Sequence, residues 1–250
     1  MFPLRDDNPA LQTSIATFAI IGLNLASWAF LQGLGSEPNL SVSVCTLGVI
    51  PGELLGTVAA GTQVPMGNAS CILGPEPNWL TPFSSMFMHG GWMHILGNLW
   101  FLYIFGDNVE DSMGSFRFVV FYLLCGLAAV AAQVYSNTSS AIPMVGASGA
   151  IGGVMGAYAL LYPKAPVHMM LVFGFFLHRV VVPAYMMLGY WMLLQVLGGA
   201  FQSTGGGGTA FWAHIGGFVA GLALVPLFRV ERRVVHHREH MAEARSHRWG

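Results

Sequence analysis

Long apolar runs separated by short polar segments dominate the pattern of residues along this chain. A helix that crosses the hydrocarbon core of a membrane needs about 20 mostly apolar residues. Runs that meet this requirement lie near residues 13–34, 92–112, 115–135, 146–162, 183–201 and 210–228. The pattern therefore predicts an all-α fold, a polytopic membrane protein whose six transmembrane helices form a bundle over residues 1–228. A polar, basic tail follows at 229–250.

The composition supports this interpretation. Hydrophobic residues make up 54% of the chain and charged residues 8%, whereas about a quarter of the residues in soluble domains are charged. The 32 glycines also fit a helical bundle, because small residues let membrane helices pack closely. We therefore expect the lipid bilayer as a partner and no nucleic acid, and the composition excludes a soluble domain.

The distribution of lysine and arginine predicts the orientation of the bundle. Cytoplasmic loops of membrane proteins are enriched in these residues. With six helices, every basic residue falls on one side, and the opposite loops at 35–91, 136–145 and 202–209 contain none. Both termini are therefore expected in the cytoplasm, with the helices in the plasma (inner) membrane. The run near 13–34 is interpreted as a retained first helix, and the tail as a solvated helix near anionic headgroups.

Three connections carry further signals. The segment Val167–Phe176 is apolar but short, which predicts an interfacial or re-entrant piece; the alternative is a helix continuous with the fifth span. Cys45 and Cys71 both fall in the long loop at 35–91, where they form either a disulfide or two free thiols. Four successive glycines predict a flexible link at 202–209, so the fifth helix is either a side gate for substrates or a fixed helix.

Two glycine-rich stretches each carry one reactive side chain near the start of a predicted helix. GASGAIGGVMGAY (146–158) contains Ser148, and AHIGGFVAG (213–221) contains His214. Glycines on the same faces predict that the fourth and sixth helices touch, which brings both side chains to one depth near the outer surface. A neutral histidine within hydrogen-bond reach can take the proton of a serine and so activate it as a nucleophile. The alternative is a hydrogen bond between helices without chemistry.

The stretch HGGWMHILGN (89–98) places His94 and Asn98 on one face of the second predicted helix. Both side chains can donate hydrogen bonds without a fixed charge, as stabilisation of the oxyanion in acyl transfer requires. The alternative is that they only cross-link helices. His89 lies at the end of the loop and is expected to fix that loop. A metal site built from His89, His94 and His214 is disfavoured because no H-E-x-x-H motif is present, and no cofactor is predicted.

Taken together, these stretches resemble the rhomboid family of intramembrane serine proteases. The resemblance runs from about Met1 to Phe228 and includes, in this order, PLRDDNP, FMHGGWMHILGNLWFLYIFGDNVED, GASGAIGGVMGAY and AHIGGFVAGL. It implies a six-helix core with a Ser–His dyad. Its functional residues are then the nucleophile Ser148, the base His214, and His94 and Asn98 in the oxyanion hole. It also implies cleavage of transmembrane protein substrates near their outer ends.

The chain departs from the family pattern at two places. Many members carry an aromatic residue four positions after the nucleophile, packed on the base, where this chain has Gly152. Something else must then orient His214, or its orientation is looser. Some relatives have a Trp-Arg pair in the first loop, where Trp79 is followed here by Leu80. Neither change removes a reacting group.

The function predicted from the sequence is that of a serine endopeptidase that hydrolyses a peptide bond in or next to a transmembrane segment. The alternative is a catalytically inactive rhomboid-fold protein that binds membrane helices, but such a protein need not keep Ser148 and His214. A transporter or channel is disfavoured, because no span carries the carboxylates or paired charges expected along an ion path. The acidic Asp107, Glu110 and Asp111 lie near the inner end of the second predicted helix, where capping or loop contacts account for them. The sequence predicts neither the physiological substrate nor the oligomeric state.

Overall fold

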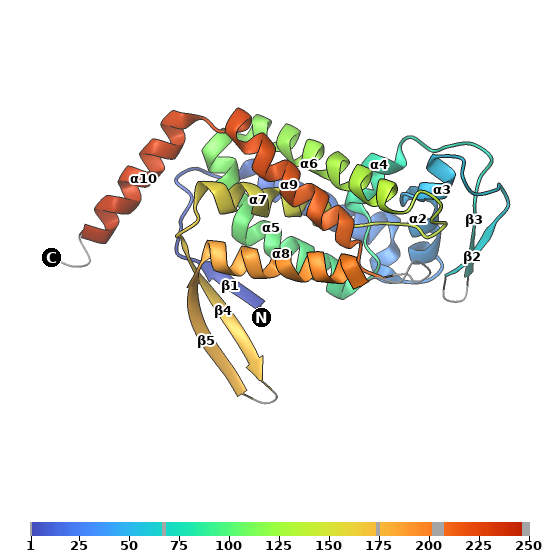
Figure 1. Cartoon of the computed structure of the whole chain (residues 1–250), viewed down its shortest axis with the longest axis horizontal. Helices are drawn as coiled ribbons and strands as arrows, with labels where there is room; N and C mark the ends of the chain where they lie inside the picture. Colours follow the sequence, from blue (N-terminus) through green and yellow to red (C-terminus); the bar gives the residue numbers. More distant parts are fainter. Residues whose placement is uncertain (1, 67–68, 174–175, 202–207, 247–250) are drawn as a thin grey trace.

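The computed structural model describes residues 2–66, 69–173, 176–201 and 208–246 (Figure 1). Helices lie at all six predicted positions. They are α1 (Ile15–Ala26), continued by a π-helix (Ser27–Leu31), α5 (Trp92–Met113), α6 (Ser115–Ser136), α7 (Ser148–Leu161), α8 (Ala184–Phe201) and α9 (Phe211–Phe228). Among the described helices, α6, α8 and α9 are long and apolar enough to cross a membrane. A count of six spans stays a prediction, and most of the predicted flexible link at 202–209 lies outside the described residues.

The centre of the bundle is α7, which packs against α5, α6 and α9 and is buried without interruption from Gly149 to Tyr158. A Cβ atom added to Gly217 of α9 would lie 1.9 Å from the carbonyl oxygen of Gly149. One added to Gly221 would lie 2.0 Å from the carbonyl oxygen of Gly153. No side chain fits in such a gap, so the backbones of α7 and α9 touch directly. This confirms the contact that the glycine spacing predicts.

The chain is mostly helical, as predicted, and a three-stranded antiparallel sheet adjoins the bundle. Its strand order is β1 (Phe2–Asp6), β4 (Pro166–Phe173), β5 (Phe176–Pro183). The described part of the segment at 167–176 lies in the strands β4 and β5, so the alternative of a helix continuous with α8 is wrong. The physical reason is that β4 pairs with β5 along its length and with β1 at its start, so its backbone groups find their partners in strands. An interfacial or re-entrant position stays a prediction.

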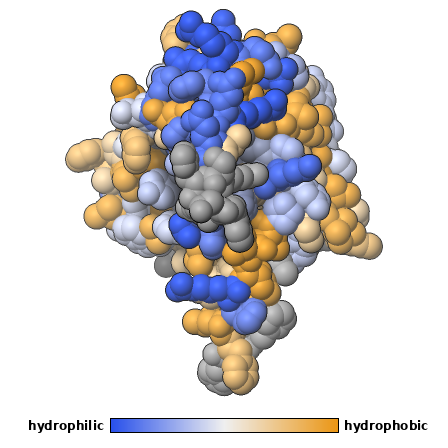
Figure 2. Space-filling model, turned by 90° about the vertical axis from the view of Figure 1, so that its left-hand side faces the viewer, coloured by the Kyte–Doolittle hydropathy of each residue, from blue (hydrophilic) through white to orange (hydrophobic). Residues whose placement is uncertain are grey.

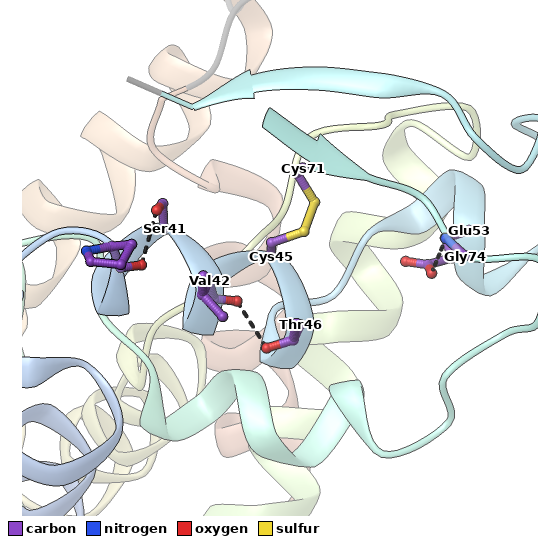
Figure 3. The surroundings of a disulfide bond; sticks show 8 residues. Ser41, Val42, Cys45, Thr46, Glu53, Cys71 and Gly74 are labelled. Atoms are coloured by element: carbon purple, nitrogen blue, oxygen red, sulfur yellow. Dashed lines mark hydrogen bonds between the residues drawn. A yellow bond between two sulfur atoms is a disulfide. The ribbon is translucent and has the colours of Figure 1, made fainter. Parts of the chain in front are cut away.

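The long loop at 35–91 forms a structured cap on one end of the bundle. It contains α2 (Asn39–Leu47), α3 (Pro51–Leu54), an antiparallel pair of strands β2 (Gln63–Met66) and β3 (Ala69–Ile72), and α4 (Thr81–Ser84). A disulfide between Cys45 of α2 and Cys71 of β3 ties this pair to the helix (Figure 3). The alternative of two free thiols is therefore wrong.

The predicted tail helix is present as α10 (Glu231–Ser246), at the end of the bundle opposite the cap (Figure 1). Hydrophilic residues gather on this end of the molecule (Figure 2). The helix is not wholly solvated, because Val234 and His237 are buried. The Nε2 atom of His237 hydrogen-bonds to the carbonyl oxygen of Pro9 at 3.1 Å, so the tail packs on the segment before α1.

Buried acidic side chains hold the N-terminal segment at the same end of the bundle. The carboxylate of Glu110 in α5 accepts hydrogen bonds from the backbone N–H groups of Ala16 and Thr17, at 2.9 and 2.7 Å, and so caps α1. Asp6 of β1 accepts a hydrogen bond from the hydroxyl of Tyr158. Burial raises the pKa of Asp6 from 3.8 to about 6, so folding shifts the proton equilibrium of this carboxyl group toward the protonated form.

Replacing Asp6 with asparagine is expected to change how stability depends on pH. A raised pKa in the folded state gives stability that is fully present below the unfolded pKa of 3.8 and is lost as pH rises through about 6. The melting temperature of the wild type should therefore fall between pH 4 and pH 7 more than that of Asp6→Asn. Thermal unfolding in detergent across this range measures it, and parallel curves for the two proteins would contradict the assignment.

Replacing Gly217 with valine is expected to destabilise the protein, because the new side chain needs the space of the Gly149 carbonyl group. Overpacking of a filled core costs on the order of 1–3 kcal/mol, occasionally more, and here the blocking atom is backbone. Gly189→Val in α8 is the matched control, since an added Cβ there meets nothing within 4 Å. Thermal unfolding should show a loss for Gly217→Val alone; equal melting temperatures would refute close contact of α7 and α9.

Candidate active site

Ser148 and His214 lie at the starts of the two helices whose backbones touch. Ser148 is the first residue of α7, and His214 lies in the first turn of α9. The start of α9 is held by Gln133 of α6, whose side-chain oxygen accepts a hydrogen bond from the backbone N–H of Ala213 at 3.2 Å. The Oγ atom of Ser148 and the Nε2 atom of His214 are 2.8 Å apart. The structure therefore brings together the serine and histidine selected from the sequence, in hydrogen-bond contact.

The second ring nitrogen of His214 has a partner that the sequence analysis missed. Its Nδ1 atom lies 2.7 Å from Oε1 of Gln195 in α8, and Gln195 is 8% exposed. The sequence did contain an indication of this role. Gln195 is the one carboxamide in an otherwise apolar helix, and polar groups within a membrane tend to mark functional sites. What the sequence could not indicate is that α8 packs beside His214.

Trp191 of α8 supplies the aromatic contact to His214 that Gly152 cannot make. The rings of Trp191 and His214 have centroids 5.6 Å apart with an interplanar angle of 38°. A Cβ added to Gly152 would lie 3.0 Å from the carbonyl oxygen of His214 and 3.7 Å from the Trp191 ring. An aromatic side chain at position 152 would therefore meet Trp191. An aromatic ring does lie beside the imidazole, but it comes from α8 rather than from α7.

His94 and Asn98 of α5 lie on the other side of Ser148. The Nδ1 atom of His94 accepts a hydrogen bond from the backbone N–H of Gly90 at 3.2 Å, which leaves the ring proton on Nε2. A Cβ added to Gly146 would lie 2.7 Å from that Nε2 atom and 3.4 Å from Oγ of Ser148. Two hydrogen-bond donors can therefore face the serine: Nε2–H of His94 and the amide of Asn98, whose Nδ2 atom is buried without a partner.

His89 lies in the loop before α5, and its ring packs edge-on against that of His94, with centroids 5.2 Å apart. Its backbone N–H donates to Oε1 of Gln32 at 2.8 Å, and its carbonyl oxygen accepts from Nε2 of Gln32 at 2.7 Å. Burial lowers the pKa of His89 to about 3, with a smaller contribution from His94, so its ring is neutral. These contacts agree with the prediction that His89 fixes the loop.

A cavity of about 690 Å³ gives access to the cluster. The polar side chains in its lining are His94, Asn98, Gln133, Ser136, Asn137, Ser140, Ser148, Thr209 and His214. Among the described residues, the lining contains no Asp, Glu, Lys or Arg. Water can therefore reach Ser148. Within the described part of the chain, no group of three or more His, Cys, Asp or Glu side chains could hold a metal ion.

Comparison with known proteins yields one family. The model of the Rhomboid domain matches residues 76–231. Rhomboid-like protein 11, chloroplastic, of Arabidopsis thaliana is 29% identical over 159 residues, which is 60% of this chain and 52% of that protein. Rhomboid protease GluP of Bacillus subtilis (strain 168) is 34% identical over 107 residues, or 43% of this chain and 20% of that protein. The chain thus spans about half the length of the first relative and less of the second.

Proposed function

Because the chain belongs to the rhomboid family, we propose that it is an intramembrane serine endopeptidase that hydrolyses a peptide bond in or next to a transmembrane segment. The observation that carries this proposal is the 2.8 Å contact between Oγ of Ser148 and Nε2 of His214, in a cavity that water can enter. A binding-only member of the family would need neither the contact nor the cavity. Its substrates are proteins of the bilayer.

In the proposed reaction, Oγ of Ser148 attacks the carbonyl carbon of the scissile bond while Nε2 of His214 takes the hydroxyl proton. The carbonyl oxygen becomes an oxyanion, which accepts hydrogen bonds from Nε2–H of His94 and from Nδ2–H of Asn98. His214 then gives its proton to the leaving amine as the C–N bond breaks. His214 then takes a proton from a water molecule whose oxygen attacks the acyl carbon of the acyl-enzyme, and it gives this proton to Oγ of Ser148 as the ester bond breaks and the acid product leaves.

The proposed cleavage occurs near the outer end of the substrate helix. Ser148 and His214 lie at the ends of α7 and α9 remote from α10 (Figure 1), and positive charge on the tail favours a cytoplasmic position for α10. The disulfide between Cys45 and Cys71 supports this orientation, since such bonds persist on the oxidising side of a membrane. Both termini are accordingly proposed to be cytoplasmic, with residues 1–228 as the membrane domain and 229–250 as the basic tail.

Ser148→Ala and His214→Ala are each expected to abolish cleavage of a single-span model substrate, because nucleophile and base act as one unit. In serine proteases such losses reach about 10⁴- to 10⁶-fold and are not additive. A fluorophosphonate probe should label the wild type but not Ser148→Ala. Ser43→Ala in α2 is the control, because Ser43 does not line the cavity and its hydroxyl donates to the carbonyl oxygen of Leu40. Cleavage retained by folded Ser148→Ala would eliminate Ser148 as the nucleophile, and a folded wild type that neither cleaves nor is labelled would favour the binding-only alternative.

His94→Ala and Asn98→Ala are expected to lower kcat by on the order of 10²- to 10³-fold each and to leave KM nearly unchanged. Their partner, the oxyanion, exists only near the transition state, so ground-state binding should not depend on them. Gly97→Ala is the control on the same helix, since an added Cβ there meets nothing within 4 Å. An increase in KM with constant kcat would instead assign both side chains to helix cross-linking or substrate binding.

A further inference from the structure

We propose that Gln195 of α8 is a positioning residue for the dyad, whose side-chain oxygen holds the imidazole of His214 in the tautomer that can accept the serine proton. The proposal rests on the function proposed above and names a third member of the same site. Gln195 does not line the cavity, so it acts through His214 and not through the substrate.

The tautomer follows from the two contacts of the ring. For the Ser148 hydroxyl to donate to Nε2 at 2.8 Å, that nitrogen must be free of hydrogen, and the ring proton is then on Nδ1. The Nδ1–H group donates to Oε1 of Gln195 at 2.7 Å. In the other tautomer, Nε2 would carry the proton and could not take one from serine, and the lone pair of Nδ1 would face a carbonyl oxygen. One hydrogen bond from α8 therefore selects the basic form of Nε2.

The orientation of the Gln195 amide is itself fixed. Its Nε2 atom donates to the carbonyl oxygen of Trp191, one turn earlier on α8, at 3.2 Å. A flipped amide would lose this bond and would point its NH₂ group at Nδ1 of His214, which favours the unproductive tautomer. Because the NH₂ end is held by the backbone, the oxygen end faces the imidazole. Both ends of the amide are used, as expected for a polar side chain that is 8% exposed.

An amide suits this depth better than the carboxylate found in soluble serine proteases. An isolated ionised carboxylate within the membrane is costly, whereas an amide oxygen accepts the same hydrogen bond without charge. The surrounding positions of α8 are apolar and half exposed: Leu193, Leu194 and Val196. The chain thus obtains control of tautomer and ring angle from a neutral group, with less stabilisation of the protonated imidazole than a carboxylate would supply.

The test uses Gln195→Met, which keeps the side-chain length and removes the acceptor. We expect its rate of labelling by a fluorophosphonate to fall on the order of 10²-fold, as for loss of an orienting hydrogen bond to a functional histidine. For a single-span substrate, kcat should fall and KM should stay. Gln195→Glu, which keeps an acceptor oxygen, should recover at least a tenth of the wild-type labelling rate. Leu193→Ala, on the exposed face of α8, should label as the wild type does.

Nuclear magnetic resonance of ¹⁵N-labelled histidine supplies a readout that altered packing alone would not move. The signal of His214, assigned by its loss in His214→Ala, should show a protonated Nδ1 in the wild type and in Leu193→Ala, and a shift toward protonated Nε2 in Gln195→Met. Wild-type labelling rate and tautomer in Gln195→Met would overturn the positioning role. If Gln195→Met does not fold, loss of labelling in folded Gln195→Glu would overturn it instead. A wild type that the probe does not label would refute the proposed function itself, a result distinct from either.

Discussion

The direct contact between the backbones of α7 and α9 is the constraint on which the rest of this structure depends. Ser148 immediately precedes Gly149, and His214 lies one turn before Gly217, so the two side chains project from the point where the helices are closest. Helices are stiff over one turn, and the separation at the glycines therefore sets the separation of Oγ and Nε2, which is 2.8 Å. A proton can be transferred over about that distance and not over an ångström more.

Most of the buried and half-buried polar groups discussed above are paired. Glu110, Asp6 and Gln195 all have hydrogen-bond partners, as removal from water requires. Several buried side-chain atoms of the described residues lack a partner, but only one of them, Nδ2 of Asn98, belongs to a residue that lines the cavity with Ser148. An unpaired buried donor costs about 1–3 kcal/mol. A cross-link between helices would leave Nδ2 of Asn98 paired. The unpaired amide instead agrees with the proposed role of Asn98, in which its acceptor, the oxyanion, forms only during the reaction.

The sequence predicted those features that depend on local spacing. Glycines at fixed intervals from Ser148 and His214 were enough to predict that two helices touch, and the apolar runs located the helices. Features that depend on a distant partner could not be predicted. β4 looked like a short membrane segment because its run is almost wholly apolar, although its main partner β5 follows it directly in the chain. Its second partner, β1 of the N-terminal segment, could not be predicted, and the disulfide stayed open because sequence does not indicate how far Cys45 lies from Cys71. Gln195 was missed because the sequence shows a polar side chain in an apolar helix but does not show that His214 lies beside it.

The position of α8 links access to the site with the reactivity of the site. Ser148 and His214 are held by helices in backbone contact, whereas Gln195 and Trp191 contact His214 from α8. Many of the other side chains of α8 are exposed on the outside of the bundle: Tyr185, Met186, Tyr190, Leu193, Leu194, Val196, Leu197 and Phe201. Such a surface is where a transmembrane substrate can approach from the bilayer. If α8 moves aside to admit one, the imidazole loses the hydrogen bond to Gln195 and the neighbouring ring together. Under the proposed function, the dyad would then be fully oriented only after α8 had returned to α9, so substrate entry would precede proton transfer.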